Sequence, residues 1–78
     1  MDDRLSVEVV LATAERQVLL TVNVEEGASV ADVVAGSGIQ SQFPGLAVAV
    51  MAVGIWGKPV SRDSTVNAGD RVELYRPL

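Results

Sequence analysis

The chain of 78 residues contains no cysteine and no histidine. Without cysteine it forms no disulfide, and it has no thiolate to hold zinc or an iron–sulfur cluster. Without histidine it lacks the commonest metal ligand and the usual general base near neutral pH. Catalysis of the Ser–His–Asp or Cys–His kind is therefore excluded within this chain. The sequence predicts a protein that is not an enzyme and that has no catalytic residue, metal ligand or cofactor-binding residue.

Basic residues are also few, since six Lys and Arg stand against ten Asp and Glu and the formal net charge is −4. Nucleic acid and anionic membranes attract a basic surface, so the composition argues against both as partners. Residues 33–57 carry no charge, but glycines and Pro44 interrupt them. Their continuous apolar run, residues 46–53, is far shorter than the ~20 residues that span a membrane. The acidic N-terminus shows no signal-peptide pattern, and the lack of cysteine agrees with a cytoplasmic location.

Alternating apolar and polar residues dominate the N-terminal third. This period of two predicts a strand over residues 5–11 and a second strand over residues 18–24. The polar link at residues 14–16 is short enough to make the two strands an antiparallel hairpin. The length supports one domain, residues 1–78, whose core is thin because a domain of this size buries only about 60–65% of its unfolded surface.

A short helix is predicted after the hairpin. Ser29 stands three residues before Asp32, as in a capping box, and valines follow at helical spacing. Valine is a poor helix former, so tertiary packing must stabilise this helix. The glycines of residues 36–38 end it after about two turns. Residues 40–45 are expected to form a loop in which Phe43 fills the core.

The C-terminal third is less regular. Residues 53–56 are expected to form a strand and residues 57–59 a turn, whereas residues 47–52 fit either a strand or a helical turn. Residues 67–70 are a strong turn signal. Alternation over residues 71–75 predicts a last strand that buries its two aliphatic side chains.

Together these elements predict an α+β fold, with a mixed sheet of four to five strands and one crossover helix. A single helix over one face of such a sheet is the economical way to bury the apolar faces of the strands. Gly54 inside a strand indicates a bulge or a close backbone approach. Gly69 and Asp70 are typical of turn structure, and Glu25 and Glu26 of a solvated turn rather than of a metal-binding pair.

The last ten residues read Gly-Asp-Arg-Val-Glu-Leu-Tyr-Arg-Pro-Leu, and residues 53–60 read Val-Gly-Ile-Trp-Gly-Lys-Pro-Val. With these segments, the chain resembles the RnfH family of bacterial ubiquitin-like proteins. The resemblance spans nearly the whole chain, and the ending is its most specific part. It implies a β-grasp (ubiquitin-like) fold, similar to that of the sulfur carriers of thiamin and molybdopterin synthesis. The further matching segments are residues 7–10, 15–17, 25–30 and 37–39.

The resemblance implies no biochemical activity, because none is firmly assigned to the family. The leading expectation is a non-enzymatic, ubiquitin-like protein-interaction module with an unidentified protein partner. Family genes often lie beside the gene of a toxin-like protein, so an antitoxin-like regulator is the alternative. A sulfur carrier or protein modifier is less favoured, because such proteins need a flexible Gly-Gly end and this sequence ends in Arg76-Pro77-Leu78.

Trp56, Lys58, Arg71, Tyr75 and Arg76 are the first candidates for a partner-binding surface. If Trp56 neighbours the last strand in the sheet, aromatic and arginine side chains share one surface, a composition enriched at interface hot spots. The alternative interpretation is a half-buried tryptophan that shields the sheet edge with an arginine stacked on it.

The apolar stretch at residues 46–53 is the second candidate, through Val50 and Met51. Either it packs into the core, or it forms an exposed patch for self-association or a partner. Val50, Met51 and Ala52 also depart from the family, whose members usually have polar or charged residues there and commonly continue beyond the position of Leu78.

Overall fold

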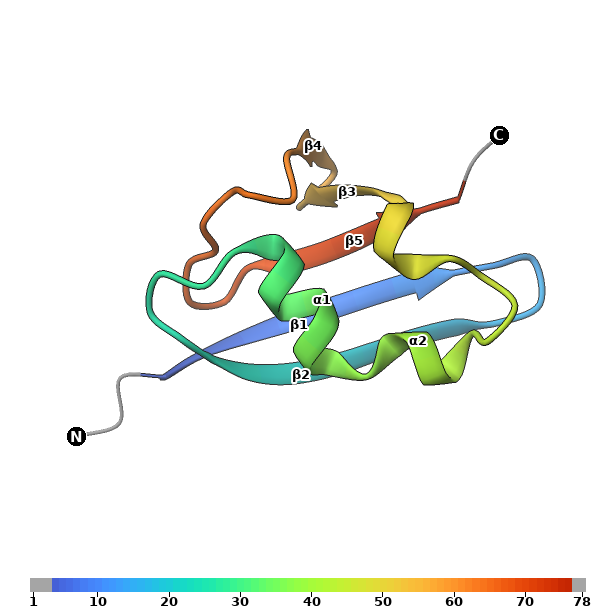
Figure 1. The fold of residues 1–78 in the computed structure, drawn as a ribbon, viewed down its shortest axis with the longest axis horizontal. Coiled ribbons are helices and arrows are strands. Elements are labelled where there is room, and N and C mark those ends of the chain that lie inside the picture. Colours follow the sequence, from blue (N-terminus) through green and yellow to red (C-terminus); the bar gives the residue numbers. More distant parts are fainter. Residues whose placement is uncertain (1–3, 77–78) are drawn as a thin grey trace.

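The computed structural model describes residues 4–76. They form five strands, β1 (Arg4–Ala12), β2 (Gln17–Glu25), β3 (Ala52–Ile55), β4 (Lys58–Val60) and β5 (Arg71–Tyr75), in one sheet (Figure 1). The order across the sheet is β2-β1-β5-β3-β4. β1 runs parallel to β5, and every other neighbouring pair is antiparallel. The sheet is therefore mixed, and the predicted α+β, ubiquitin-like fold is confirmed.

β1 and β2 form the predicted N-terminal hairpin, and each strand extends one residue further at both ends than the alternation indicated. Their register runs without a bulge from Arg4 opposite Glu25 to Ala12 opposite Gln17. Because successive side chains of a strand point to opposite faces, this register places one set of aliphatic side chains under the helices and the other set on the opposite face.

α1 (Val30–Ser37) begins with the predicted capping box. Ser29 Oγ accepts a hydrogen bond from the Asp32 N–H, and the Asp32 carboxylate accepts one from the Ser29 N–H, both at 3.1 Å. The first two N–H groups of the helix donate to the carbonyls of Ser64 and Arg62, in the loop after β4. The early donors of the helix are thus satisfied within the chain, which anchors a helix of poor intrinsic propensity.

A second helical turn, α2 (Ile39–Gln42), follows at once, so the prediction of a loop was wrong for residues 40–42. Gly38, at a φ of 73°, ends α1 in the left-handed conformation and precedes α2. The Ile39 side chain is fully buried, and this burial holds the turn against the core. Phe43 is buried behind it, as predicted. No helix within residues 4–76 has the length and apolar character that crossing a membrane requires.

The ambiguous segment at residues 47–52 divides into both predicted alternatives. η1 (Val48–Val50) is a 3-10 turn, and β3 begins shortly after it. Nη2 of Arg62 fixes this arrangement, because it donates to the carbonyl oxygens of Val48 at 2.6 Å and Met51 at 2.7 Å. The contacts that decide the conformation come from outside the segment, and its own periodicity therefore could not reveal it.

β3 and β4 are joined by a tight hairpin turn made of Trp56 and Gly57. Ile55 pairs with Lys58 across it, and the two turn residues have φ values of 50° and 81°, as in a type I′ turn. The predicted strand is therefore shifted by one residue, and the predicted turn wrongly included the first two residues of β4. The usual signal, Asn-Gly or Asp-Gly, is replaced here by Trp-Gly, so the sequence did not reveal this hairpin.

The core lies between the sheet and the helices. Its side chains come from alternate positions of β1 and β5, from β3, from α1 and α2, and from the segments that connect these elements. No polar or charged side chain is buried among residues 4–76. The buried residues are Val7, Val9, Leu11, Val30, Val33, Val34, Ile39, Phe43, Val48, Met51, Val53, Val66, Val72 and Leu74.

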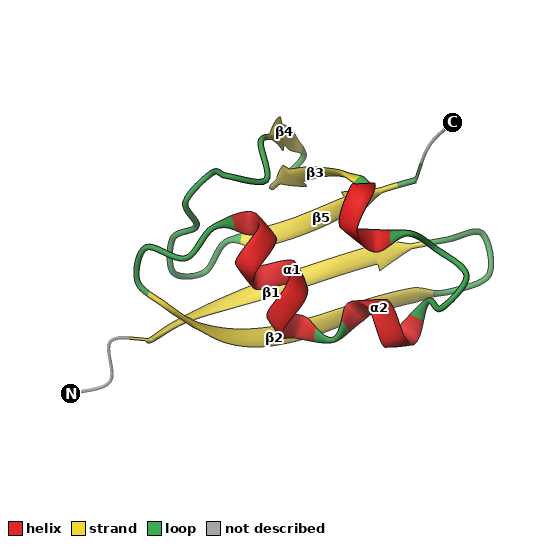
Figure 2. Ribbon diagram, in the orientation of Figure 1, coloured by secondary structure: helices red, strands yellow, loops and turns green. Residues whose placement is uncertain are grey.

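All the helical segments lie on one side of the sheet (Figure 2). The opposite side, which we call the open face, is formed by the strand residues that alternate with the buried ones. In its centre, Glu8 and Val10 of β1 lie opposite Arg71 and Glu73 of β5, and Tyr75 follows on β5. The open face therefore gathers charged, aromatic and aliphatic side chains on a rigid support.

We expect Arg62→Ala to lower the free energy of unfolding by about 2–3 kcal/mol, because two carbonyl groups lose a charged donor in a partly buried place. Urea denaturation measures the loss. Lys58→Ala, at an exposed position, is the control and is expected to stay within about 0.5 kcal/mol of the original protein. Equal effects of the two substitutions would contradict the assigned role of Arg62.

Candidate functional site

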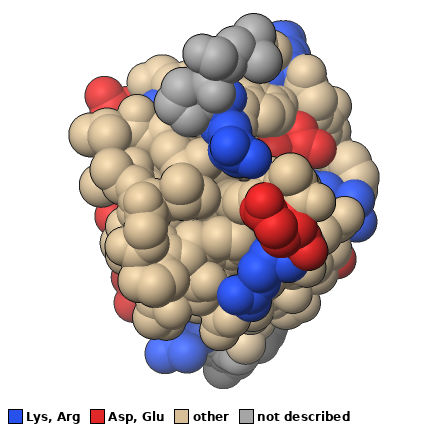
Figure 3. Space-filling model, turned by 90° about the vertical axis from the view of Figure 1, so that its right-hand side faces the viewer, with Lys and Arg blue, Asp and Glu red and all other residues tan. Residues whose placement is uncertain are grey.

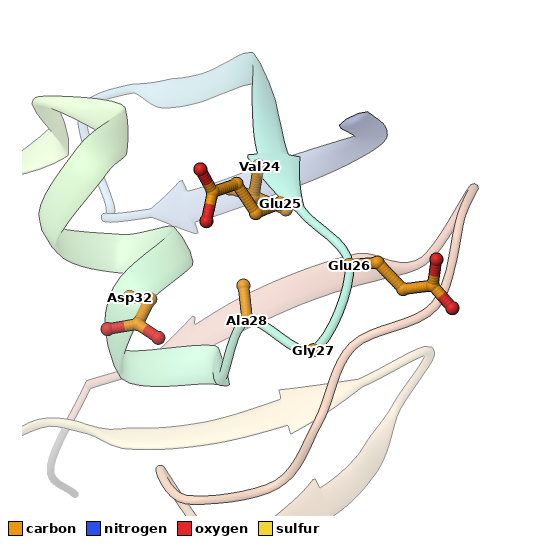
Figure 4. Close-up of a pocket in the computed structure, with 6 residues that line it drawn as sticks. All are labelled: Val24, Glu25, Glu26, Gly27, Ala28 and Asp32. Atoms are coloured by element: carbon orange, nitrogen blue, oxygen red, sulfur yellow. The ribbon is translucent and has the colours of Figure 1, made fainter. Parts of the chain in front are cut away.

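Glu25, Glu26 and Asp32 line a shallow hollow where β2 leads into α1 (Figure 4). Carboxylates in one hollow suggest a metal site, but these point in different directions, and Asp32 already caps α1. Within the described chain, no three acidic side chains are arranged to hold a metal ion. The hollow is therefore set aside as a candidate site.

The most exposed aromatic side chain of the described chain is Trp56, at 59% exposure. Its φ of 50° is unfavourable for a bulky residue and costs on the order of 1–3 kcal/mol. Two hydrogen bonds from β5 hold the turn in place: the Trp56 N–H donates to the Arg71 carbonyl at 3.1 Å, and the Gly57 N–H donates to Glu73 Oε1 at 2.7 Å. The turn thus presents a large aromatic ring at a position where glycine or asparagine would be less strained.

Arg71 connects this ring to the first strand. Its Nε donates to Glu8 Oε1 at 2.9 Å, and its guanidinium carbon lies 4.8 Å from the centre of the Trp56 ring. Both charged side chains are about one-third exposed, so the ion pair itself adds little stability. Its effect is orientation, because a guanidinium fixed by a carboxylate holds the indole ring by a cation–π contact.

Glu73 and Tyr75 form the second half of the arrangement. The Tyr75 hydroxyl donates to Glu73 Oε1 at 2.8 Å, the same oxygen that accepts from the turn. A Cβ on Gly54 would collide with the Tyr75 hydroxyl and would lie 2.8 Å from the Lys58 carbonyl oxygen. The tyrosine ring therefore lies across Gly54 and occupies the space that any other side chain would fill. The nearby Lys58 carbonyl oxygen confirms the predicted close backbone approach at this glycine. We call Glu8, Trp56, Arg71, Glu73 and Tyr75 the Trp56 platform.

A mainly apolar hollow adjoins the Trp56 platform on the open face. Val10 and Ala12 of β1 contribute to it, with Pro59 of β4 on the other side. Glu73 and Tyr75 belong to both the platform and the hollow, so the two features form one continuous surface. Its remaining lining residues are Gly57, Leu74 and Arg76.

The environment of Tyr75 raises the pKa of its hydroxyl above the ordinary value of 10.0. Removal from water is the largest cause, and the hydrogen bond to Glu73 and the negative charge of Glu73 add to it. Tyr75 therefore stays neutral at physiological pH and acts as a hydrogen-bond donor. A nucleophile would need the opposite shift.

Three of the residues predicted for the site lie together: Trp56, Arg71 and Tyr75 belong to the platform, and Arg76 lines the adjoining hollow. Lys58 does not join them, because it pairs with Ile55 on the face of the sheet that the helices cover.

The apolar stretch contributes less surface than the sequence allowed. Met51 is buried at 6% exposure, and so is Val48 at 2%, whereas Val50 is 81% exposed on η1. Val50 is therefore the one large apolar side chain of this stretch that is exposed, beside the smaller exposed side chains of Ala47, Ala49 and Ala52.

Sequence reasoning missed Glu8 and Glu73, the two carboxylates that order the platform. Alternation with buried neighbours would have placed each of them on the open face. It could not have brought them together, because β1 and β5 pair in parallel across the whole length of the chain.

Figure 3 shows the end of the molecule at the right of Figure 1, where charges of both signs are scattered over a mostly uncharged surface. The β1–β2 turn is fixed to α2 in this part of the chain. Arg16 donates to the carbonyl and to the side-chain oxygen of Gln42, each at 3.1 Å, and its guanidinium carbon lies 5.0 Å from the centre of the Phe43 ring. These contacts explain Arg16 as a structural residue.

Gly54→Ala is expected to lower the free energy of unfolding by about 1–3 kcal/mol, because the added methyl group displaces Tyr75 and strains the β3–β4 pair. Thermal or urea denaturation measures this. Gly36→Ala is the matched control, since the space around it is open and it lies inside α1. That substitution is expected to be neutral or stabilising by up to about 1 kcal/mol. A neutral Gly54→Ala would show that Tyr75 does not need this space.

The raised pKa of Tyr75 is directly measurable, because the chain has a single tyrosine whose phenolate absorbance reports on it alone. Since the folded pKa lies above the unfolded value, the stability linked to this proton is complete below pH 10.0 and is lost as the pH rises through the folded pKa. Glu73→Gln is expected to lower the pKa without restoring the ordinary value, because burial remains. An unchanged titration curve would remove Glu73 as a cause.

The sequence matches a known protein family and several of its members. The profile described as RnfH family ubiquitin matches residues 5–78. The chain is 49% identical over 76 residues to Protein RnfH of Pseudomonas savastanoi pv. phaseolicola, covering 95% of this chain and 73% of the relative. It is 42% identical to Protein RnfH of Laribacter hongkongensis, covering 97% and 70%, and 45% identical to Protein RnfH of Salmonella newport, covering 100% and 81%. The sheet order, the crossover helix and these matches together show that the chain belongs to the RnfH family of ubiquitin-like proteins.

Proposed function

We propose that this protein is a non-enzymatic interaction module and that a protein partner binds the Trp56 platform. The observation that carries the proposal is a tryptophan held 59% exposed at a positive φ. Strained backbone persists only where surrounding contacts enforce it, and it concentrates at functional sites. An asparagine would form the same turn with less strain, so stability alone does not account for tryptophan here.

The composition of the surface favours a protein over other ligands. Tryptophan, tyrosine and arginine are the residues most enriched at interface hot spots, and the platform contains one of each. The platform has two carboxylates against one arginine, so the surface is not basic and offers no patch for nucleic acid. The adjoining apolar hollow provides a recess beside the aromatic anchor.

The chemistry of the platform supports the absence of catalysis. The chain has no cysteine or histidine, and each platform carboxylate is paired with a donor. Tyr75, the only remaining candidate nucleophile of the platform, has a raised pKa. Rigid orientation of side chains that do not react is the arrangement expected of a binding surface.

Trp56→Asn tests the proposal sharply, because Asn-Gly is the preferred type I′ pair and the fold should be kept or stabilised. The original protein is immobilised on a support and exposed to a lysate of the native cell. The partner that it captures is then purified, and its binding to each variant is measured by calorimetry. We expect the original protein to bind it and Trp56→Asn to bind about 30-fold more weakly, which corresponds to a hot spot of about 2 kcal/mol.

Val50→Asn is the matched control, since it replaces another exposed apolar residue outside the platform. It is expected to bind the partner as the original protein does. If folded Trp56→Asn binds equally well, the Trp56 platform is not the contact surface. If only Val50→Asn loses binding, the partner contacts η1 instead.

A further inference from the structure

The two edges of the sheet differ in their protection against pairing with another strand. β4 has the features that natural proteins use to block an edge: it is three residues long and contains Lys58 and Pro59. β2, at the lower edge in Figure 1, is nine residues long and has neither lysine nor proline. It carries no charge between Gln17 and Val24, and its register with β1 has no bulge. Such an edge is a template for a further strand.

The hydrogen-bonding groups that β2 presents outward can be identified. At the hairpin end, the Thr13 N–H donates to the Arg16 carbonyl at 2.7 Å, which fixes the alternation of bonded and non-bonded pairs along β1 and β2. The N–H and C=O groups of Leu19, Thr21 and Asn23 therefore point away from β1. Within residues 4–76, no strand and no side chain pairs with these groups.

We propose that β2 pairs with β2 of a second copy of this chain, antiparallel about a two-fold axis, with Thr21 opposite Thr21. This centre gives full overlap of the nine-residue strands and matches outward-pointing groups with outward-pointing groups. Leu19 then lies opposite Asn23 of the second copy. The two sheets become one continuous sheet with both sets of helices on the same side, and the pairing closes as a dimer.

The side chains of β2 fit a second copy of themselves. On the helix-covered face, Val18 lies opposite Val24 and Leu20 opposite Val22, which are aliphatic and β-branched pairs of the kind that stabilise sheets. The half-exposed state of these residues in the single chain leaves apolar area to be covered.

Charge complementarity also favours a second copy over a foreign strand. The antiparallel register places the Arg16 end of one strand beside the Glu25–Glu26 end of the other, at both ends of the pair. Glu25, the only charge within β2, lies opposite the neutral Gln17. No like charges oppose one another along the pairing, although each chain carries a net charge of −4.

An interface made of one strand edge is smaller than the roughly 1,200 Å² that stable complexes bury, so the dimer is expected to be concentration-dependent. Sedimentation velocity over a range from micromolar to millimolar protein detects it. Thr21→Pro removes an outward N–H without touching the ladder to β1, whereas Thr21→Val keeps that N–H at a similar side-chain volume. We expect Thr21→Val to dimerise like the original protein and Thr21→Pro to require at least about ten-fold higher concentration.

The two-fold axis through Thr21 allows a second, independent test. Thr21→Lys and Thr21→Glu each place like charges opposite one another and are expected to stay monomeric alone, whereas an equimolar mixture is expected to form a dimer. Amide hydrogen exchange gives the residue-level result: protection should rise with concentration at Leu19, Thr21 and Asn23, but not at Leu20 and Val22.

The proposal is overturned if the original protein is monomeric at millimolar concentration, which would leave the edge to a strand of another protein. It is equally overturned if Thr21→Pro dimerises as readily as Thr21→Val, or if the charged variants fail to complement each other. Thr21 lies opposite Glu8 in the β1–β2 register, so the charged variants place a charge beside the Trp56 platform and are used for the dimer test alone. Thr21→Val and Thr21→Pro add no charge there, and with these two variants partner binding by the platform and pairing through β2 succeed or fail separately.

Discussion

The parallel pairing of β1 with β5 is the contact on which the rest of the structure depends. β5 stands between β1 and β3, so without this pairing the sheet would fall into an N-terminal hairpin and a separate C-terminal group of strands. Two backbone hydrogen bonds at the start of β5 establish its register: the Glu8 N–H donates to the Asp70 carbonyl, and the Gly69 N–H to the Ser6 carbonyl, each at 2.9 Å. The turn that contains Gly69 therefore joins the sheet before the first paired residue of β5.

The same pairing creates the Trp56 platform. Glu8 and Arg71 are separated by 63 positions in the sequence, yet the parallel register places them opposite each other on the open face. β3 then adds the β3–β4 turn on the other side of β5. There the Trp56 ring contacts Arg71, and the Gly57 N–H donates to Glu73. Each platform residue is thus held by at least two strands. This shared support explains how a strained tryptophan is kept in one conformation.

The sequence was sufficient for elements that are determined by their own residues. The hairpin alternation, the capping box at Ser29 and Asp32, the turn before β5 and the burial of Phe43 were all predicted correctly. The errors fall where distant contacts decide. α2 forms because Ile39 is buried, η1 because Arg62 binds its carbonyl groups, and the turn at Trp56 because β5 supplies its hydrogen bonds.

For the site, residue type identified Trp56, Arg71 and Tyr75, since aromatic and arginine side chains are the ones that interfaces favour. The carboxylates that orient them were not identified, because a lone glutamate in an alternating strand looks like any solvated residue. Lys58 was grouped with Trp56, Arg71 and Tyr75 because the strand boundary beside Trp56 was off by one residue. For Met51 the sequence left burial and exposure open, because the conformation of residues 47–52 was undecided, and the structure shows that it is buried. The extent of the domain and the cytoplasmic location remain predictions from the sequence.

The union of the first strand with the last has a consequence for how the protein is made. A ribosome releases β1 and β2 early, but β5 is encoded at the end of the described chain and emerges after almost everything else. Until then, Val7, Val9 and Leu11 lack the core neighbours that β5 supplies, and the nascent hairpin exposes an aliphatic face. Pairing between segments so far apart is slow, because the chain between them must be ordered first. The domain therefore completes its core only after β5 has emerged, and the growing chain is most vulnerable to aggregation just before that moment.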